Sequence, residues 1–478
     1  MKGLTGRETR GIGFLATATA LGYGVTIGSI PIIAKLIPPE RFDFYAKVFP
    51  IASGLGPIMA LRFEGAIVLA RTKAMREAAL NFCVLSVIAI SAALFALLLI
   101  LHFIALANGY SGALPTLGIG LGLLIGIAVA LQAVSESWLV ANEEARLLAI
   151  LRFVTLLAIV LFQVCVGLAK GGGAGLVVAH FLGIAGPAGF VIARHGRKAF
   201  RKTAHSRRSL GAVFTKYRRY LFYTVPFTLL GFVRERTIYF IFSASEATGS
   251  AAFYYMAYRI MSMPSMFGAS ALRPVVFKAL SKRERSGGCE IVRQLFPICG
   301  WVVVIAFPVA MVFSDTLYSI GLKDTWFSGH QYIKFVGVAM ALRTCVVWLD
   351  KTYELKNRQD VGLYVEAVNS VLVLGALFSA IGLGISLERA VGWQMAALAV
   401  GYVLMMVSVF NVGGYGIGFL LRCLVVGVVS WYVWSGVLIM IKNYLGGYVG
   451  LLFSGGIVLL GGLIALKNFR SVGRRVAA

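Results

Sequence analysis

The sequence predicts an all-α polytopic membrane protein with about fourteen transmembrane helices. Hydrophobic residues make up 59% of the 478 residues, and only 13% are charged. Soluble domains are usually about 45–50% apolar and about 25% charged, so this chain is too apolar to be one. Its apolar residues also form runs of about 20, the length of helix that crosses a bilayer. The alternating pattern of a membrane barrel is absent, so the spans are expected to be helices.

Fourteen apolar runs follow one another with short connections. The first comes after the basic segment Met1–Arg10 and is too long for the apolar part of a signal peptide, so a retained transmembrane helix is expected. The predicted spans are residues 11–34, 43–61, 79–104, 115–139, 147–168, 174–193, 218–242, 251–273, 295–314, 332–349, 361–385, 392–410, 417–440 and 448–466.

The excess of basic residues predicts the orientation. Lys and Arg number 45 against 19 Asp and Glu, which gives a net charge of +26. When the loops are assigned alternately to two sides, 32 basic residues fall on the side of the N-terminus, eight on the other side and five within spans. Positively charged loops stay in the cytoplasm, so a multi-pass protein of the inner membrane with both termini cytoplasmic is predicted. This distribution excludes the nucleic-acid partner that a basic chain otherwise suggests.

The spans are expected to form two pseudo-symmetric six-helix lobes plus two C-terminal helices. A weak repeat supports this division, since Phe42–Arg71 aligns with Phe253–Lys282 at an offset of 211 residues. An offset by an even number of helices relates the lobes by an axis along the membrane normal. The predicted parts are a first lobe over 1–193, a basic cytoplasmic linker over 194–217, a second lobe over 218–412, and two extra helices with a cytoplasmic tail over 413–478.

Charges at membrane depth are the candidate functional residues, because they are costly there and usually face an aqueous interior. On the seventh span, Arg234 continues a polar stripe. Arg236 instead lies on the face of Phe232 and Val233, about one turn earlier, and is expected to reach outward or to pair between helices. Arg259 and Arg343 lie at similar depth on later spans, and Lys47 is one position from the repeat equivalent of Arg259.

These cations predict a binding site for a diphosphate. Guanidinium groups donate hydrogen bonds in a planar fork and stay charged when partly desolvated, which suits phosphate. The alternative is an internal ion-pair network of Arg234, Glu235 and Arg259 that joins two helices. The predicted ligands are Arg234, Arg259, Arg343, Arg236 and Lys47.

Acidic residues within the spans are few. Glu235 and Glu366 are candidates for ion coupling, because buried carboxylates can titrate near neutrality. Glu136 and Arg152 are both expected near the cytoplasmic face, where they can pair. The six cysteines have no ligand spacing, and no catalytic or ATP-binding motif is present, so no metal, cofactor or enzymatic activity is expected.

Two motifs at the second span resemble the N-terminal region of bacterial polysaccharide and O-antigen (Wzx-type) flippases. These belong to the superfamily that also contains multidrug and lipid II exporters. The first motif is the turn Pro39-Glu40-Arg41-Phe42-Asp43-Phe44-Tyr45, and the second is Leu61-Arg62-Phe63-Glu64-Gly65-Ala66-Ile67-Val68. Asp43 stands where the family often has Gly, and Phe63 stands where it often has Tyr. Arg62 and Glu64 are interpreted as a structural pair.

This resemblance implies an alternating-access flippase for a polyprenyl-diphosphate-linked oligosaccharide. It also implies contact with membrane lipids and with the polysaccharide polymerase and glycosyltransferase machinery. The last two helices resemble those that border a lipid groove in lipid II flippases.

Two other functions remain open. A cation-coupled multidrug exporter would be expected to carry acidic residues in its cavity, and the first span has none. A membrane glycan polymerase or ligase usually carries a large periplasmic loop, whereas every periplasmic loop predicted here is short.

Overall fold

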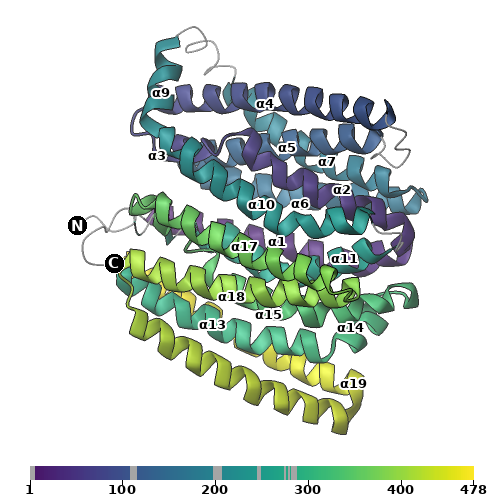
Figure 1. Cartoon of the computed structure of the whole chain (residues 1–478). Helices are drawn as coiled ribbons and strands as arrows, with labels where there is room; N and C mark the ends of the chain where they lie inside the picture. The colour runs from purple at the N-terminus through teal and green to yellow at the C-terminus, as the bar shows by residue number, and fades with distance from the viewer. Residues whose placement is uncertain are drawn as a thin grey trace. The chain divides into compact units, whose positions relative to one another are not determined.

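The computed structural model describes residues 6–107, 116–196, 207–244, 249–273, 276–277, 280 and 288–477 (Figure 1). Every regular element in these ranges is a helix, so the predicted all-α polytopic membrane class is confirmed. The long helices are α1 (Gly6–Leu36), α2 (Pro39–Met59), α4 (Lys73–Ala107), α5 (Thr116–Ala141), α6 (Ala145–Leu168), α7 (Gly173–Val191), α10 (Val225–Ala244), α11 (Ser250–Phe267), α13 (Gly288–Val312), α15 (His330–Val346), α17 (Gln359–Gly382), α18 (Leu387–Gly413) and α19 (Ile417–Ala477).

Short helices connect several of the long ones. They are α3 (Glu64–Leu69), α9 (Arg207–Arg219), α14 (Ser314–Gly321), α16 (Thr352–Leu355) and the 3₁₀ helix η4 (Asp324–Gly329). Three single turns of π-helix, η1 (Ile192–Gly196), η2 (Tyr220–Thr224) and η3 (Gly268–Leu272), extend α7, precede α10 and extend α11. The helix α9 lies mostly within the segment predicted as a basic linker.

Four long helices are less suited to the membrane than the others. Nine segments of the described chain are long and apolar enough to span a bilayer, and the last of them is α19. The helices α2, α10, α11 and α15 are not among the nine. Each of these four carries charged or many polar residues within a short length, which favours contact with other helices or with an aqueous interior over contact with lipid.

The chain divides into two compact units. The N-terminal unit is Ala20–Ala252, and the C-terminal unit is Phe253–Ala478 together with the first part of α1. In the N-terminal unit, α2 packs against α5, α7 and α10, and α6 packs against α7. In the C-terminal unit, α13 packs against α15 and α19, and α18 packs against α15 and α17.

The last element, α19, contains both of the C-terminal spans predicted from the sequence. Gly446 has φ 76° and ψ 168°, which interrupts the helix, and Figure 1 shows the two halves running back alongside each other. Leu438 of the first half packs with Val309 and Phe313, and Leu451 of the second half joins the same cluster. Both halves are therefore anchored on α13 and on the residue that follows it.

A strained corner follows α2. Leu61 and Arg62 have φ of 51° and 58°, in the left-handed region that non-glycine residues seldom adopt. The Arg62 guanidinium Nη1 lies 3.2 Å from Glu64 Oε1, which ties the corner to α3. This contact confirms the predicted structural pair. The pairing of Glu136 with Arg152 is also confirmed, with an Nη2–Oε2 distance of 2.6 Å.

One polar contact fixes the turn of α19. Lys442 Nζ lies 2.7 Å from Asp315 Oδ2 and donates a 2.9 Å hydrogen bond to the Val312 carbonyl at the end of α13. Partial burial works to raise the pKa of Asp315, but hydrogen bonds from Lys442 and from the Thr316 N–H hold that pKa below its usual range. The stabilisation is therefore present above about pH 4 and is lost as the pH falls through the lowered pKa.

We predict that Lys442→Met loosens the turn of α19. The pair is partly exposed, so its loss costs less than about 1 kcal/mol and raises local hydrogen exchange about two- to five-fold. Hydrogen-exchange mass spectrometry over residues 436–450 measures this change. Lys467→Met is the matched control, and an equal effect of the control contradicts the role assigned to Lys442.

Candidate functional site

The candidate site residues lie mainly on the four less apolar helices. Lys47 is on α2, Arg234, Glu235 and Arg236 are on α10, and Arg259 and Arg343 are on α11 and α15. Glu366 is on α17. Lys47 and the α10 residues belong to the N-terminal unit, whereas the other three belong to the C-terminal unit. Each group is described within its own unit.

Arg234 is a buried cation with an acidic neighbour. Its side chain is 6% exposed, and its Nη2 lies 3.4 Å from Glu235 Oε1. The Glu235 side chain is itself only 15% exposed. Removing two charges from water is costly, and each partner offsets part of the cost for the other. This contact realises the part of the predicted ion-pair network that lies on α10.

Arg236 lies where α10 approaches α2. A Cβ built on Gly54 would be 2.5 Å from the Phe232 ring and 3.5 Å from Arg236 Nε, so the two helices meet closely at this glycine. The Arg236 guanidinium also lies over the Tyr239 ring, 5.9 Å from its centroid. Arg236 is therefore partly buried where α10 meets α2.

Lys47 has a carboxylate partner on its own helix. Its Nζ lies 2.7 Å from Asp43 Oδ2, one turn earlier, and the other Asp43 oxygen accepts a 3.3 Å hydrogen bond from the Ala252 N–H. The i, i+4 spacing in the sequence is the signal that predicts this pair. Because Asp43 offsets its charge, Lys47 adds little net positive charge for an anion.

A polar cluster in the N-terminal unit was missed by the sequence analysis. The Tyr45 hydroxyl lies 2.9 Å from His180 Nδ1 and accepts a 3.3 Å hydrogen bond from Gln163 Nε2. Three helices, α2, α6 and α7, supply these side chains, and the Phe49 ring lies 4.1 Å from the imidazole. The only signal in the sequence is a His and a Gln inside otherwise apolar spans.

In the C-terminal unit, Arg343 is held by a tyrosine. Arg343 Nη1 donates a 2.5 Å hydrogen bond to the Tyr258 hydroxyl, which connects α15 to α11. One turn earlier on α11, Tyr254 lies 6.0 Å from both the Tyr258 and the Tyr332 rings. The aromatic side chains orient Arg343 without cancelling its charge, because a phenol is neutral.

Arg259 is the cation with the least compensation. It follows Tyr258 directly on α11 and is partly buried. Among the residues that the structure describes, no carboxylate lies within 4 Å of its guanidinium, and its buried Nη1 has no hydrogen-bond partner. Tyr258 thus links the two arginines, because its hydroxyl accepts a hydrogen bond from Arg343 and Arg259 is the next residue in the sequence. Arg259 thus gives this unit a positive charge with no described carboxylate beside it, which a phosphate can neutralise.

Glu366 lies in a buried polar region between α17 and α18. It is 4% exposed, and Asn369, one turn later, is completely buried. Within the described part of the chain, neither polar atom of the Asn369 amide has a hydrogen-bond partner. A Cβ on Gly401 would be 1.7 Å from Asn369 Oδ1, so α18 admits this amide only because residue 401 is glycine. The region combines a buried carboxylate with an unsatisfied amide, which suits a proton or a small cation.

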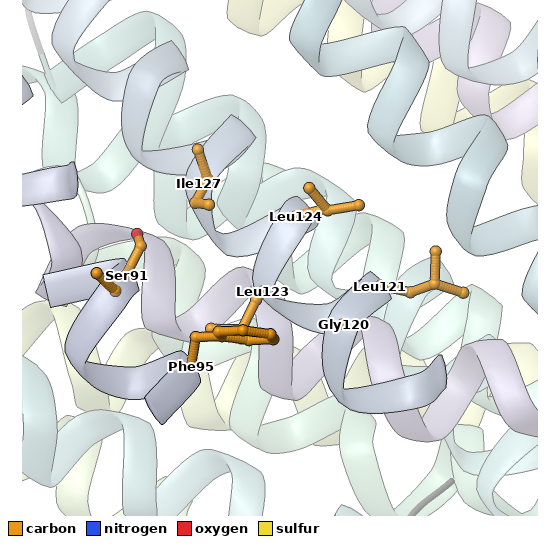
Figure 2. Close-up of a pocket in the computed structure, with 8 residues that line it drawn as sticks. Ser91, Phe95, Gly120, Leu121, Leu123, Leu124 and Ile127 are labelled. Carbon is orange, nitrogen blue, oxygen red and sulfur yellow. The ribbon is translucent and has the colours of Figure 1, made fainter. Parts of the chain in front are cut away.

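An apolar groove lies between α4 and α5 (Figure 2). Its volume is about 730 Å³, and it is lined by Ser91, Ala92, Phe95, Gly120, Leu121, Leu123, Leu124 and Ile127. The Ser91 hydroxyl is already directed to Met59 Sδ at 3.5 Å. With no charged side chain in its lining, this groove cannot hold a diphosphate.

We predict that Tyr258→Phe weakens the contact between α11 and α15. The variant leaves the Arg343 guanidinium without its phenol acceptor, at a cost of about 0.6–2 kcal/mol. The midpoint of thermal unfolding of the purified protein is expected to fall by a few degrees. Tyr364→Phe, at a residue that is 71% exposed, is the control and should leave the midpoint unchanged. Equal midpoints for both variants would show that the hydrogen bond does not stabilise the fold.

Comparison with known proteins gives structural relatives only. No protein-family profile matches the chain, and no curated protein matches its sequence. The solved structure of the lipid II flippase MurJ, in an inward closed conformation, aligns with a TM-score of 0.62 and 13% identity over 95% of this chain and 99% of that one.

Multidrug transporters share the architecture. VcmN, a MATE transporter of Vibrio cholerae, aligns with a TM-score of 0.56 and 15% identity over 85% of this chain and 95% of its own. A multidrug resistance transporter of the MATE family, in an inward-facing conformation and assigned to the MOP superfamily, aligns with a TM-score of 0.53 and 15% identity over 83% and 95%. The chain therefore has the fold of the MOP-superfamily transporters.

Proposed function

We propose that the protein is a transporter that moves a polyprenyl-diphosphate-linked oligosaccharide across the bacterial inner membrane by alternating access. The observation that carries this proposal is Arg259 of the C-terminal unit, a partly buried cation with no carboxylate within 4 Å among the described residues, next in sequence to the tyrosine that bonds Arg343. The likeness of the fold to a lipid II flippase supports it, as does the resemblance of the Pro39–Tyr45 and Leu61–Val68 motifs to polysaccharide flippases.

In this proposal Arg259 and Arg343 hold the diphosphate. Arg259 donates directly, while Tyr258 keeps Arg343 oriented through its hydrogen bond to Nη1. The oligosaccharide occupies an aqueous interior and the polyprenyl chain stays in the lipid. The expected partners are membrane lipids and the polymerase and glycosyltransferases that use the same lipid-linked intermediates. We also propose the domain organisation predicted from the sequence, with two six-helix lobes, a basic linker and two extra C-terminal helices. Both termini are proposed to be cytoplasmic.

Arg234 is proposed as a second diphosphate contact, with Arg236 beside it, and its availability depends on Glu235. While Glu235 is ionised, it offsets the charge of Arg234 at 3.4 Å. A proton on Glu235 would remove that counter-charge and strengthen the attraction of the guanidinium for an anion. Glu366, buried beside the unsatisfied Asn369 amide, is the second candidate for ion coupling. Proton uptake at Glu235 and anion binding at Arg234 would thus favour each other.

A multidrug exporter is the second candidate, because the MATE transporters share the fold. Such a protein would bind cations with acidic residues. Here the described charges on α11 and α15 are positive, which disfavours a cationic drug. Drug efflux without any change in surface polysaccharide would favour this candidate over the flippase.

We predict that Arg259→Gln combined with Arg343→Gln abolishes surface polysaccharide in the source bacterium. Each lost charge-assisted hydrogen bond weakens diphosphate binding by roughly ten- to one-hundred-fold. Complementation of a deletion strain, followed by analysis of surface polysaccharide and of accumulated lipid-linked intermediates, tests this. Titration of the purified protein with polyprenyl diphosphate gives the affinity directly.

The matched control for the double variant is Arg389→Gln, at an exposed residue before the middle of α18. All variants must insert at wild-type levels. Normal polysaccharide from the double variant would refute the cationic site, and a loss caused equally by Arg389→Gln would show that the effect is not specific.

Ion coupling is tested separately in liposomes. Glu366→Gln is expected to slow transport at least several-fold and to remove its dependence on an imposed pH gradient, because an amide cannot take up a proton. Glu388→Gln, at an exposed acidic residue, is the control. If Glu366→Gln and Glu235→Gln both retain the wild-type response to the gradient, neither residue carries the coupling.

A further inference from the structure

The helix α9 is a basic amphipathic helix that the transport proposal does not use. The segment from Arg194 to Arg219 contains ten Lys or Arg residues and no Asp or Glu. Its last part, Arg207–Arg219, forms α9, which is followed by the π-helical turn η2 and then by α10. A charged segment without acidic residues has no counter-ions of its own and attracts anions.

One face of α9 is fixed to the N-terminal unit. Val213 and Tyr217 are buried, and the Phe214 ring lies 6.4 Å from Phe82 of α4. Tyr220, at the start of η2, packs near Phe63, with 6.1 Å between the ring centroids. These contacts hold α9 against α4, so its opposite face has a defined direction.

Cations are exposed on α9 and beside it. Lys216, Arg218 and Arg219 are exposed on α9, and Arg71 and Lys73 are exposed just before and at the start of α4. Burial raises the pKa of Tyr217 while the positive charge of Arg71 acts on it to lower that pKa, so Arg71 lies close to α9. No described carboxylate forms an ion pair with Arg71, Lys73, Lys216 or Arg218. We name Arg71, Lys73, Lys216, Arg218 and Arg219 the basic collar.

Aromatic side chains are exposed beside the basic collar. Phe214, Phe222 and Tyr223 are 39%, 60% and 36% exposed. Aromatic residues at such positions are typical of the boundary between lipid tails and headgroups. Cations next to exposed apolar side chains, here on α9, on η2 and at the start of α4, are typical of segments that lie in the membrane interface and bind anionic lipids. A soluble anion would gain nothing from the aromatic side chains.

We propose that the basic collar binds the phosphate headgroups of anionic phospholipids, with Phe214, Phe222 and Tyr223 inserted among the lipids around them. In the orientation predicted from the loop charges, these are lipids of the cytoplasmic leaflet. The site is separate from the membrane-depth arginines. It would anchor the helix that leads directly into α10, the element that carries Arg234 and Glu235.

The test measures lipid binding to the full-length purified protein in detergent. Native mass spectrometry with added phosphatidylglycerol, and in parallel with phosphatidylcholine, gives the apparent affinities. Arg71→Gln/Lys216→Gln/Arg218→Gln is expected to weaken phosphatidylglycerol binding by on the order of 100-fold. Phosphatidylcholine should bind weakly to wild type and variant alike. Arg71→Lys/Arg218→Lys, which keeps the charge, should bind phosphatidylglycerol nearly as wild type does.

The control variant Arg146→Gln/Lys356→Gln/Lys467→Gln removes the same charge from exposed residues on the same predicted side of the membrane. Unchanged phosphatidylglycerol affinity in the collar variant, or an equal loss in the control, would overturn the proposal. Displacement of the lipid by millimolar inorganic phosphate would also overturn it, because the site would then hold a free anion. Only variants with wild-type thermal stability are compared. If the triple variant unfolds, Phe222→Ser serves as the second variant. Wild-type affinity for phosphatidylglycerol in Phe222→Ser would count against insertion of the aromatic residues.

Discussion

The cost of holding a charge at membrane depth governs the candidate site. A single Arg at the centre of a spanning helix costs about 2.5–3.5 kcal/mol by insertion scales, and the cost must be offset locally. Lys47 and Arg234 have carboxylate neighbours, and Arg343 has a phenol. Arg259 has neither a carboxylate nor a described hydrogen-bond partner for its buried Nη1. The way each charge is compensated therefore separates Arg259 from the other membrane-depth cations and makes it the first of the proposed ligands to test.

This difference divides the chemistry between the two units. In the N-terminal unit, Asp43 offsets the charge of Lys47 and Glu235 that of Arg234, whereas in the C-terminal unit Arg343 of α15 donates to the neutral Tyr258 of α11. A phenol keeps a guanidinium in place and leaves its charge intact, which a carboxylate does not. Glu366 and Asn369, on α17 of the same C-terminal unit, supply the contrasting oxygen-rich environment. The proposed anion contacts and the proposed ion-coupling residue thus have different surroundings in that unit.

Much of the fold could be predicted because lipid imposes a simple rule on sequence. Long apolar runs must be helices, and all fourteen predicted spans correspond to long helical segments, including the two halves of α19 separated by Gly446. The short helices could not be found in this way. Helix α9 has a polar composition, and only the spacing of Val213 and Tyr217 reveals its apolar face.

The candidate site was predictable in residue type but not in pairing. Charges inside spans stand out in the sequence, and partners close along the chain, such as Asp43 for Lys47, follow from helical spacing. The hydrogen bond between Tyr258 and Arg343 joins residues 85 positions apart, and nothing local announces it. The contact of Tyr45 with His180 likewise joins residues that are far apart in the sequence. Such pairings depend on how helices pack, which the pattern along one helix does not encode.

The four less apolar helices also bear on how the chain enters the membrane during synthesis. Insertion machinery tests each segment for hydrophobicity as it leaves the ribosome, and α10 and α11 follow each other with no strongly apolar helix between them. Neither can rely on its own partition into lipid. The helix α10 packs against α2, which is made earlier and belongs to the same N-terminal unit. The N-terminal unit is thus expected to be complete only when α10 has docked on α2, before the rest of the C-terminal unit is made.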